Sequence, residues 1–96
     1  MDNERYKRMA RVLKAVGNPS RLKIVHRLGE GEATVGELTA ITELDQSTVS
    51  KHLSLLRGQG IVDDRRDGNN VYYRLLTPCV LKFFECASKV TGQNHG

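Results

Sequence analysis

Residues 45–76, DQSTVSKHLSLLRGQGIVDDRRDGNNVYYRLL, are the stretch that decides the fold of this chain. Asp45 is a favourable residue for the N-cap of a helix. Val49, Leu53 and Leu56 follow it at i, i+4 and i+7, which places them on one face of a helix directed at a core. The first half of the stretch therefore predicts an amphipathic helix that ends near residue 57.

The second half of the stretch predicts a two-stranded hairpin. Glycines at positions 58 and 60 tolerate the left-handed backbone that commonly ends a helix. Ile61 and Val62 open a strand, and the sequence Asp-Gly-Asn-Asn over 67–70 is a strong turn signal. Residues 71–76 then alternate as a half-buried strand does. The arginines of the hairpin that lie nearest its tip are Arg65 and Arg66.

The open face of the predicted helix consists of short polar side chains and one cation: Gln46, Ser47, Ser50, Lys51 and Ser54. No acidic residue follows the cap, and acids there would be repelled by phosphate. Short polar side chains let a helix approach the edges of bases, and a helix N-terminus attracts phosphate. An ordinary solvated helix would carry a similar face, but the arginine-bearing hairpin behind it favours DNA binding.

Three more helices are predicted before this stretch. Tyr6, Met9, Leu13 and Val16 have helical spacing over residues 4–16. A second helix begins at the cap-and-proline pair Asn18-Pro19 and continues to about residue 28. A third, short helix begins at a Thr34–Glu37 capping box and presents Leu38 and Ile41 as its apolar edge.

The last predicted helix, residues 78–91, carries two neighbouring apolar stripes. One consists of Cys79, Phe83, Cys86 and Val90, and the other of Val80, Phe84 and Ala87. Together they exceed what one small core can cover, so we expect a self-association face, which the helix over 4–16 is a candidate to join.

Charge and composition are consistent with one nucleic-acid-binding domain over residues 1–96. The net charge is +4, and residues 1–29 alone carry eight Lys and Arg against two Asp and Glu. A basic face of this kind suggests a polyanionic partner, although it also occurs on ordinary solvated helices. The sequence has two cysteines, no apolar stretch of membrane-spanning length and no visible secretory signal. We therefore expect a cytoplasmic protein without a disulfide framework. Few aromatic residues disfavour a platform for single strands.

The order of elements is that of a winged helix, and the residues resemble one family with this fold. GNPSRLKIVHRL (17–28), STVSKHLSLLRGQGIV (47–62) and YYRL (72–75) resemble segments of the ArsR/SmtB family of winged helix-turn-helix repressors. The resemblance implies a mainly α fold of about five helices plus a two-stranded wing. Its helix-turn-helix would span about 34–57 and its wing about 61–76. It also implies a prokaryotic homodimer paired through helices 4–16 and 78–91.

The resemblance further implies where operator DNA binds. The family's recognition positions correspond to Gln46, Ser47, Thr48, Ser50, Lys51 and His52, and its wing positions to Arg65, Arg66, Asn69 and Asn70. Two-fold geometry would place the two recognition helices in grooves about 34 Å apart on a palindrome. A sequence-specific transcriptional repressor is therefore the expected function. The alternative is a winged-helix module that binds protein or RNA without operator specificity.

The sequence departs from the family where a metal would bind. The segment 34–38 lacks the cysteines of the family's third-helix site. Along the last helix, Cys79 occupies one zinc position, but the distal positions correspond to Val90 and Gln93. A pair formed by Cys86 and His95 lacks further ligands. No metal site is predicted with a complete ligand set.

Cys79 and Cys86 nevertheless form a candidate sensing pair. Seven residues of helix separate them by about 10 Å, too far for a bridge within one helix. If two last helices crossed antiparallel with the dimer axis near Phe83, Cys79 of one chain would meet Cys86 of the other. Such thiols could respond to oxidants, reactive sulfur or a thiophilic metal, or they could simply be small apolar residues at a helix seam. Neither cysteine has the base and orienting group that a nucleophilic enzyme needs, so no enzyme is predicted.

Overall fold

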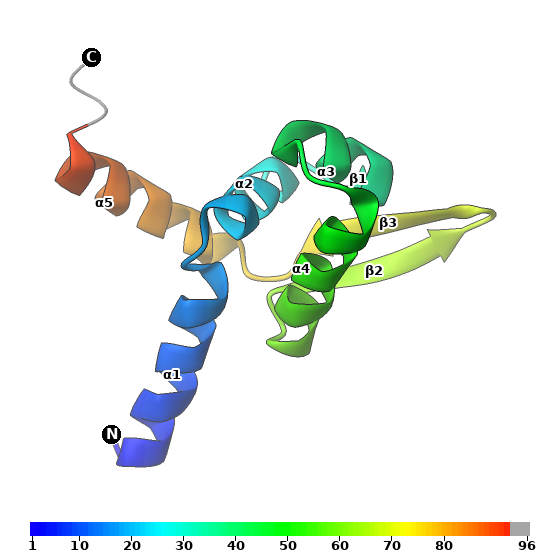
Figure 1. Ribbon diagram of the computed structural model, residues 1–96. Helices are drawn as coiled ribbons and strands as arrows, with labels where there is room; N and C mark the ends of the chain where they lie inside the picture. Colours follow the sequence, from blue (N-terminus) through cyan, green and yellow to red (C-terminus); the bar gives the residue numbers. More distant parts are fainter. Residues whose placement is uncertain (93–96) are drawn as a thin grey trace.

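The structure is a computed structural model that describes residues 1–92, so Gln93 and His95 lie outside the described part. Figure 1 shows its elements in chain order: α1 (Asn3–Val16), α2 (Pro19–Leu28), β1 (Ala33–Thr34), α3 (Val35–Thr42), α4 (Gln46–Gly58), β2 (Val62–Asp67), β3 (Asn70–Leu75), the 3₁₀ turn η1 (Pro78–Val80) and α5 (Leu81–Thr91). The predicted order of helices and hairpin is confirmed. The mainly α fold class is confirmed with it.

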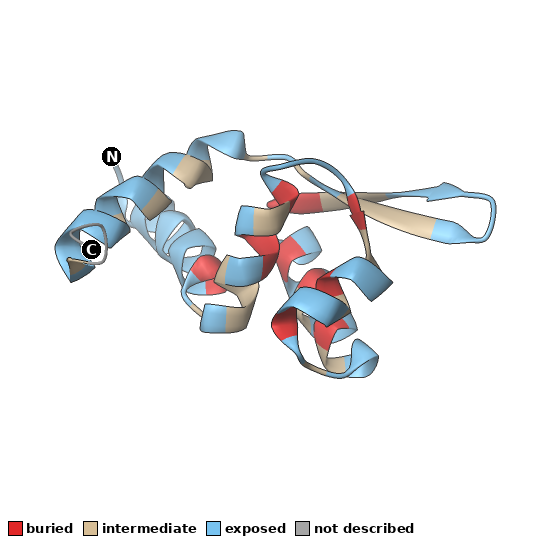
Figure 2. Cartoon of the chain, turned by 90° about the horizontal axis from the view of Figure 1, so that it is seen from above, coloured by how far each residue is buried: buried red, intermediate tan, exposed pale blue. Residues whose placement is uncertain are grey.

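The core lies between α2, α3, α4 and the base of the sheet. Figure 2 shows the buried positions gathered there, while the hairpin tip and the outer helices are exposed. Val49, Leu53 and Leu56 of α4 are fully buried, as their spacing predicted. Ile41 does not belong to the apolar edge predicted for α3: its side chain is 40% exposed, and Thr42 is buried in its place. The Thr42 hydroxyl can be buried because it donates to the carbonyl of Leu38.

Side-chain caps set the starts of the central helices. Asn18 accepts hydrogen bonds from the amides of Ser20 and Arg21 at the start of α2. The capping box of α3 is present as predicted, with Thr34 Oγ1 accepting from the Glu37 amide and Glu37 Oε1 accepting from the Thr34 amide. These caps satisfy amides that a helix leaves without partners, so they fix where each helix begins.

The sheet has three strands in the order β1-β3-β2, one more than the predicted hairpin. The additional strand is the two-residue β1, whose Ala33 and Thr34 lie opposite Tyr73 and Tyr72 of β3. Two residues are too few to show an alternating pattern, which is why the sequence does not predict this strand. β1 leads directly into α3 and therefore attaches β3 of the hairpin to the start of that helix.

The outer helices α1 and α5 leave much of their apolar surface exposed. Tyr6 and Leu13 of α1 are each 55% exposed, and Phe83 of α5 is 47% exposed. The second stripe of the last helix behaves differently, because Val80 and Phe84 pack against the core. The predicted single helix over 78–91 is divided into η1 and α5. None of the helices among residues 1–92 is both long and apolar enough to span a bilayer.

Candidate nucleic-acid interface

The open face of α4 is an uninterrupted polar ridge formed by Ser47, Ser50, Lys51 and Ser54, all of them exposed. At its N-terminus the Asp45 carboxylate accepts hydrogen bonds from the Thr48 amide at 2.7 Å and from Ser47 Oγ at 2.9 Å. These bonds hold the pKa of Asp45 below its usual value, the Thr48 amide contributing most. The cap stays ionised at neutral pH, and the ridge beyond it carries no negative charge.

Each flank of α4 contacts a different part of the molecule. On one flank, Arg57 Nη1 donates to Asp64 Oδ1 of β2 at 3.0 Å, which joins the helix to the hairpin. On the other flank, Arg21 Nη1 of α2 lies 3.2 Å from Nδ1 of His52. The hairpin and the helical body therefore support α4 from opposite sides, and the serine ridge is left free between them.

His52, which the family resemblance adds to the DNA-contacting positions, lies off the open ridge of α4. Its side chain is half-buried beside Arg21, on the flank away from the hairpin. Burial, and then the charge of Arg21, lower the pKa of His52. A neutral imidazole can accept from the guanidinium, so the ring serves as a contact between α4 and α2. Thr48, also half-buried, lies on this same flank by helical geometry.

The two arginines nearest the hairpin tip, Arg65 and Arg66, lie on opposite faces of the sheet, because they are consecutive in β2. Arg66 is on the face that carries Asp64 and therefore on the side of α4; it forms no ion pair among the described residues. Arg65 is on the far face, where its guanidinium binds Glu32. Strand alternation in the sequence separates the two arginines onto opposite faces, but the partner of Arg65 is visible only in the fold.

A hollow of about 340 Å³ brings the start of α4 together with the hairpin tip. Its lining includes Gln46, Asn69 and Asn70 from the predicted site, together with Thr34 and Gly36 from the start of α3. Gln46 thus faces the same polar space as Asn69 and Asn70, which lie more than 20 residues later in the sequence. Amide side chains and helix N-termini are groups that bind phosphate and base edges.

A basic cluster borders the other end of α4, which the sequence could not locate. Arg11 and Lys14 of α1 and Arg21 of α2 line a small hollow with Leu55 of α4 and its C-cap residue Gln59. The concentration of charge in residues 1–29 was visible in the sequence, but its position beside α4 required the fold. Positive charge at this flank strengthens the attraction of the whole face for a polyanion.

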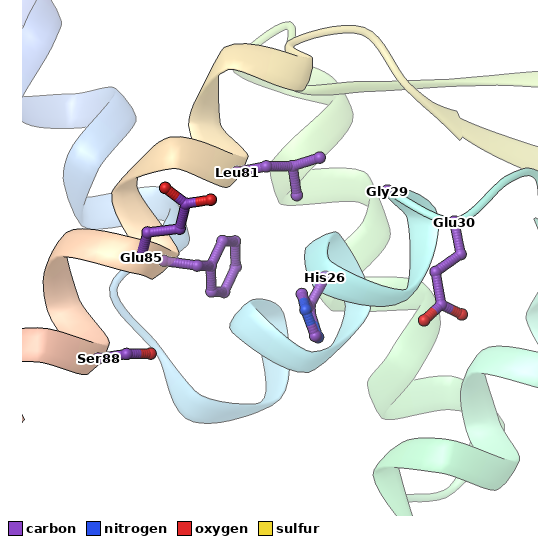
Figure 3. Close-up of a pocket in the computed structure, with 7 residues that line it drawn as sticks. His26, Gly29, Glu30, Leu81, Glu85 and Ser88 are labelled. Atoms are coloured by element: carbon purple, nitrogen blue, oxygen red, sulfur yellow. The ribbon is translucent and has the colours of Figure 1, made fainter. Parts of the chain in front are cut away.

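A hollow of about 370 Å³ lies between α2 and α5. Figure 3 shows His26, Glu30, Leu81, Glu85 and Ser88 around it. The His26 ring packs on the Phe84 ring, with 5.2 Å between centroids. Across residues 1–92, no three His, Cys, Asp or Glu side chains are grouped to hold a metal ion. Cys79, in η1, and Cys86, in α5, are both free and exposed.

The polar-ridged helix, the helix before it and the hairpin beside it define the class of winged helix-turn-helix DNA-binding proteins. Residues 18–64 match the model of the bacterial regulatory proteins of the arsR family. The chain belongs to this family and is a transcriptional regulator of the DNA-binding, winged helix-turn-helix type.

Known relatives agree with this assignment. The chain is 40% identical to nodulation protein NolR of Rhizobium meliloti, over 85% of this chain and 67% of that protein. It is 43% identical to the biofilm growth-associated repressor of Agrobacterium fabrum, over 70% of this chain but only 57% of that protein. The solution structure of a homodimeric winged helix-turn-helix domain from Mycobacterium bovis superposes with a TM-score of 0.79 and 30% identity, covering 98% of this chain and 90% of that one.

Proposed function

We propose that this protein is a homodimeric repressor that binds a palindromic operator through α4 and releases it in response to a signal. The observation that carries the proposal is the free serine ridge of α4, held between two supports and without acidic residues. A regulator of this kind acts on the chromosome, which in bacteria lies in the cytoplasm. We propose no catalytic role, and nothing in the described residues favours a protein-binding or RNA-binding module instead.

We assign base reading to the ridge of α4 and its leading edge. Ser47, Ser50 and Lys51 are exposed on the ridge, and Gln46 stands at the edge toward the hairpin tip. Glutamine makes paired hydrogen bonds to adenine, and lysine donates to guanine, while serine hydroxyls adapt to either. Thr48 and His52 are proposed to hold the helix in place beside α2 and not to contact bases.

We assign contacts with the DNA backbone to the hairpin. Arg66 faces the α4 side with no ion-pair partner among residues 1–92, and Asn69 and Asn70 line the hollow that opens beside Gln46. Phosphate contacts fix the register of a protein on a duplex, and arginine also suits a narrow minor groove. These residues would hold α4 at one position along the groove.

The exposed apolar surfaces of α1 and α5 support a homodimer. Tyr6, Met9 and Leu13 on α1, and Phe83 and Val90 on α5, are exposed to water in one chain. Patches of this kind mark interaction surfaces. The relative from Mycobacterium bovis is described as homodimeric, and a two-fold pairing would set two copies of α4 about one helical turn of DNA, roughly 34 Å, apart.

The signal is proposed to act through the cysteines of the last helical segment. Cys79 and Cys86 are exposed on the same stripe as Phe83 and Val90, which is the surface we assign to pairing. Two thiols at a pairing surface could be oxidised, modified by reactive sulfur or bound by a thiophilic metal. Among residues 1–92 neither thiol belongs to a group of three or more His, Cys, Asp or Glu side chains that could hold a metal ion, so thiol modification is the simpler form of this proposal.

Binding to a defined duplex tests the proposal directly. A palindrome from the DNA flanking the gene would be titrated with purified protein beside a scrambled duplex of equal length, over a series of salt concentrations. We expect preference for the palindrome, two chains per duplex and affinity that falls steeply with salt. Equal affinity for both duplexes would contradict sequence-specific regulation.

A further inference from the structure

Arg65 and Glu32 form a paired contact that spans the sheet. Glu32 lies immediately before β1, whereas Arg65 is in β2, so the central strand β3 runs between them. Arg65 Nε is 3.1 Å from both carboxylate oxygens of Glu32, and Nη2 is 2.8 Å from Oε1. The guanidinium carbon lies 4.8 Å from the centre of the Tyr72 ring on β3. A planar cation is thus held by a carboxylate at its edge and an aromatic ring at its face.

The contact joins the far strand of the hairpin to the body of the protein. β1 pairs only with Tyr72 and Tyr73 of β3, and it forms no ladder with β2. The pair Glu32–Arg65 passes over β3 and holds β2 directly. The hairpin beyond this point, residues 66–71, projects away from the core, as Figure 1 shows. The ion pair therefore lies where the supported part of the hairpin ends and the projecting part begins.

The charge of Arg65 is already compensated by acidic neighbours. Besides Glu32, Asp67 Oδ2 lies 3.8 Å from Arg65 Nη1, and on the same face Arg74 pairs with Asp63 at 3.3 Å. The hydrogen bond from Arg65 is the largest cause of the lowered pKa of Glu32, so this carboxylate remains charged at neutral pH. Two arginines and three acids share this face, which gives it no net attraction for phosphate.

From this geometry we propose that Arg65 is a positioning residue, which sets the angle of the hairpin through Glu32, and that Arg66 supplies the arginine contact of the hairpin with DNA. This inference rests on the proposed function, because it assigns roles within the same DNA-binding surface. It divides two adjacent arginines, alike in the sequence, into one that holds the hairpin and one that binds phosphate.

The two possible roles of Arg65 predict opposite effects of removing the charge of Glu32. If Glu32 holds the hairpin through Arg65, Glu32→Gln frees the hairpin and weakens specific binding. If Arg65 instead binds phosphate in competition with Glu32, the same substitution releases the arginine, removes a negative charge and strengthens binding. The sign of the change in affinity therefore distinguishes the roles without requiring any substitution of an arginine.

The test is a titration of the palindromic duplex by fluorescence anisotropy, over a series of salt concentrations, with five variants. We expect Glu32→Gln and Arg65→Ala each to weaken binding roughly twofold to fivefold, a size in keeping with an exposed ion pair, with no added effect when combined. Their salt slopes should match wild type. Arg66→Ala should lower the slope by about 1. Glu30→Gln, which removes a neighbouring exposed charge outside this pair, is the matched control and should not weaken binding.

A charge exchange completes the design. Glu32→Arg combined with Arg65→Glu should bind more tightly than Arg65→Glu alone, because the pair is restored in reverse. Stronger or unchanged binding by Glu32→Gln, or a lower salt slope for Arg65→Ala, would overturn the assignment. Amide hydrogen exchange without DNA gives an independent readout: residues 66–71 should exchange faster in Glu32→Gln. If wild type showed no preference for the palindrome but this exchange effect appeared, the proposed function would fail and the contact would stand.

Discussion

Arg21 and His52 connect α2 to α4 through a guanidinium–imidazole contact, with 3.2 Å between Nη1 and Nδ1. Arg21 also donates through Nε to the Ala15 carbonyl at the end of α1. One arginine thus contacts the last turn of α1 and one flank of α4. The contact requires His52 to be neutral, since a protonated ring would lose its acceptor and face a like charge.

The protonation of His52 should therefore make stability depend on pH. Burial and Arg21 lower the pKa of His52 below its ordinary value of 6.5, so the unfolded chain binds the proton more readily than the folded one. The contribution of neutral His52 to the free energy of unfolding is present in full above pH 6.5. It is lost as the pH falls from there toward the lowered pKa of His52. Urea unfolding between about pH 5 and 7.5 should show this decrease. His52→Gln should flatten the dependence of the free energy of unfolding on pH. His26→Gln is the control and should leave that dependence in place. If His52→Gln left it unchanged, the contact between Arg21 and His52 would be contradicted.

The two faces of α4 should respond differently to the same substitution. Leu53 is fully buried, whereas Leu55 is 42% exposed. Leu53→Ala should reduce the free energy of unfolding by about 3 kcal/mol, from lost burial and the cavity left behind. Leu55→Ala should cost less than about 1 kcal/mol. Chemical denaturation measures both, and equal losses would mean that the helix is rotated from the orientation described.

Disruption of the exposed apolar surface of α1 should separate the dimer. Leu13→Asp places a charge where we assign subunit contact, and sedimentation equilibrium should then report the mass of one chain. Ile41→Asp is the matched control, because Ile41 is also exposed but lies on α3. If the Leu13→Asp protein kept the wild-type mass, pairing through α1 would be wrong.

Mild oxidation should link two chains if the last helices cross antiparallel near Phe83. Cys79 of one chain and Cys86 of the other would then form a disulfide-bonded dimer on non-reducing electrophoresis. Cys79→Ser and Cys86→Ser should each abolish that species, because each removes one half of both bridges. Full cross-linking by either single variant would exclude this pairing.

Most of the helical framework could be predicted because its signals are local. Each signal involves residues that are close together in the sequence. These signals are the caps at Asn18, Thr34 and Asp45 and the spacing of Val49, Leu53 and Leu56. Ile41 was misplaced because a short helix has too few apolar positions to define its face. β1 was missed because two residues carry no pattern.

The residues of the proposed DNA-binding face can be chosen from the sequence, but their arrangement cannot. The ridge of α4 follows from its sequence, whereas the place of His52 depends on Arg21, 31 residues earlier. The different positions of Arg65 and Arg66 follow in part from strand alternation. The decisive partner of Arg65 is Glu32, which is 33 residues away and joined to it only through the sheet. Contacts between residues this far apart in the sequence can be located only when the fold is known.

The central claim is that the ridge of α4 reads sequence, and the affinity of Ser50→Ala for two duplexes tests it most directly. Anisotropy titrations would compare the palindrome with a scrambled duplex, with Ser88→Ala, an exposed serine of α5, as the control. We expect Ser50→Ala to weaken binding to the palindrome by roughly 1 kcal/mol and to leave binding to the scrambled duplex unchanged. An equal loss on both duplexes, or no loss on either, would contradict base reading by α4.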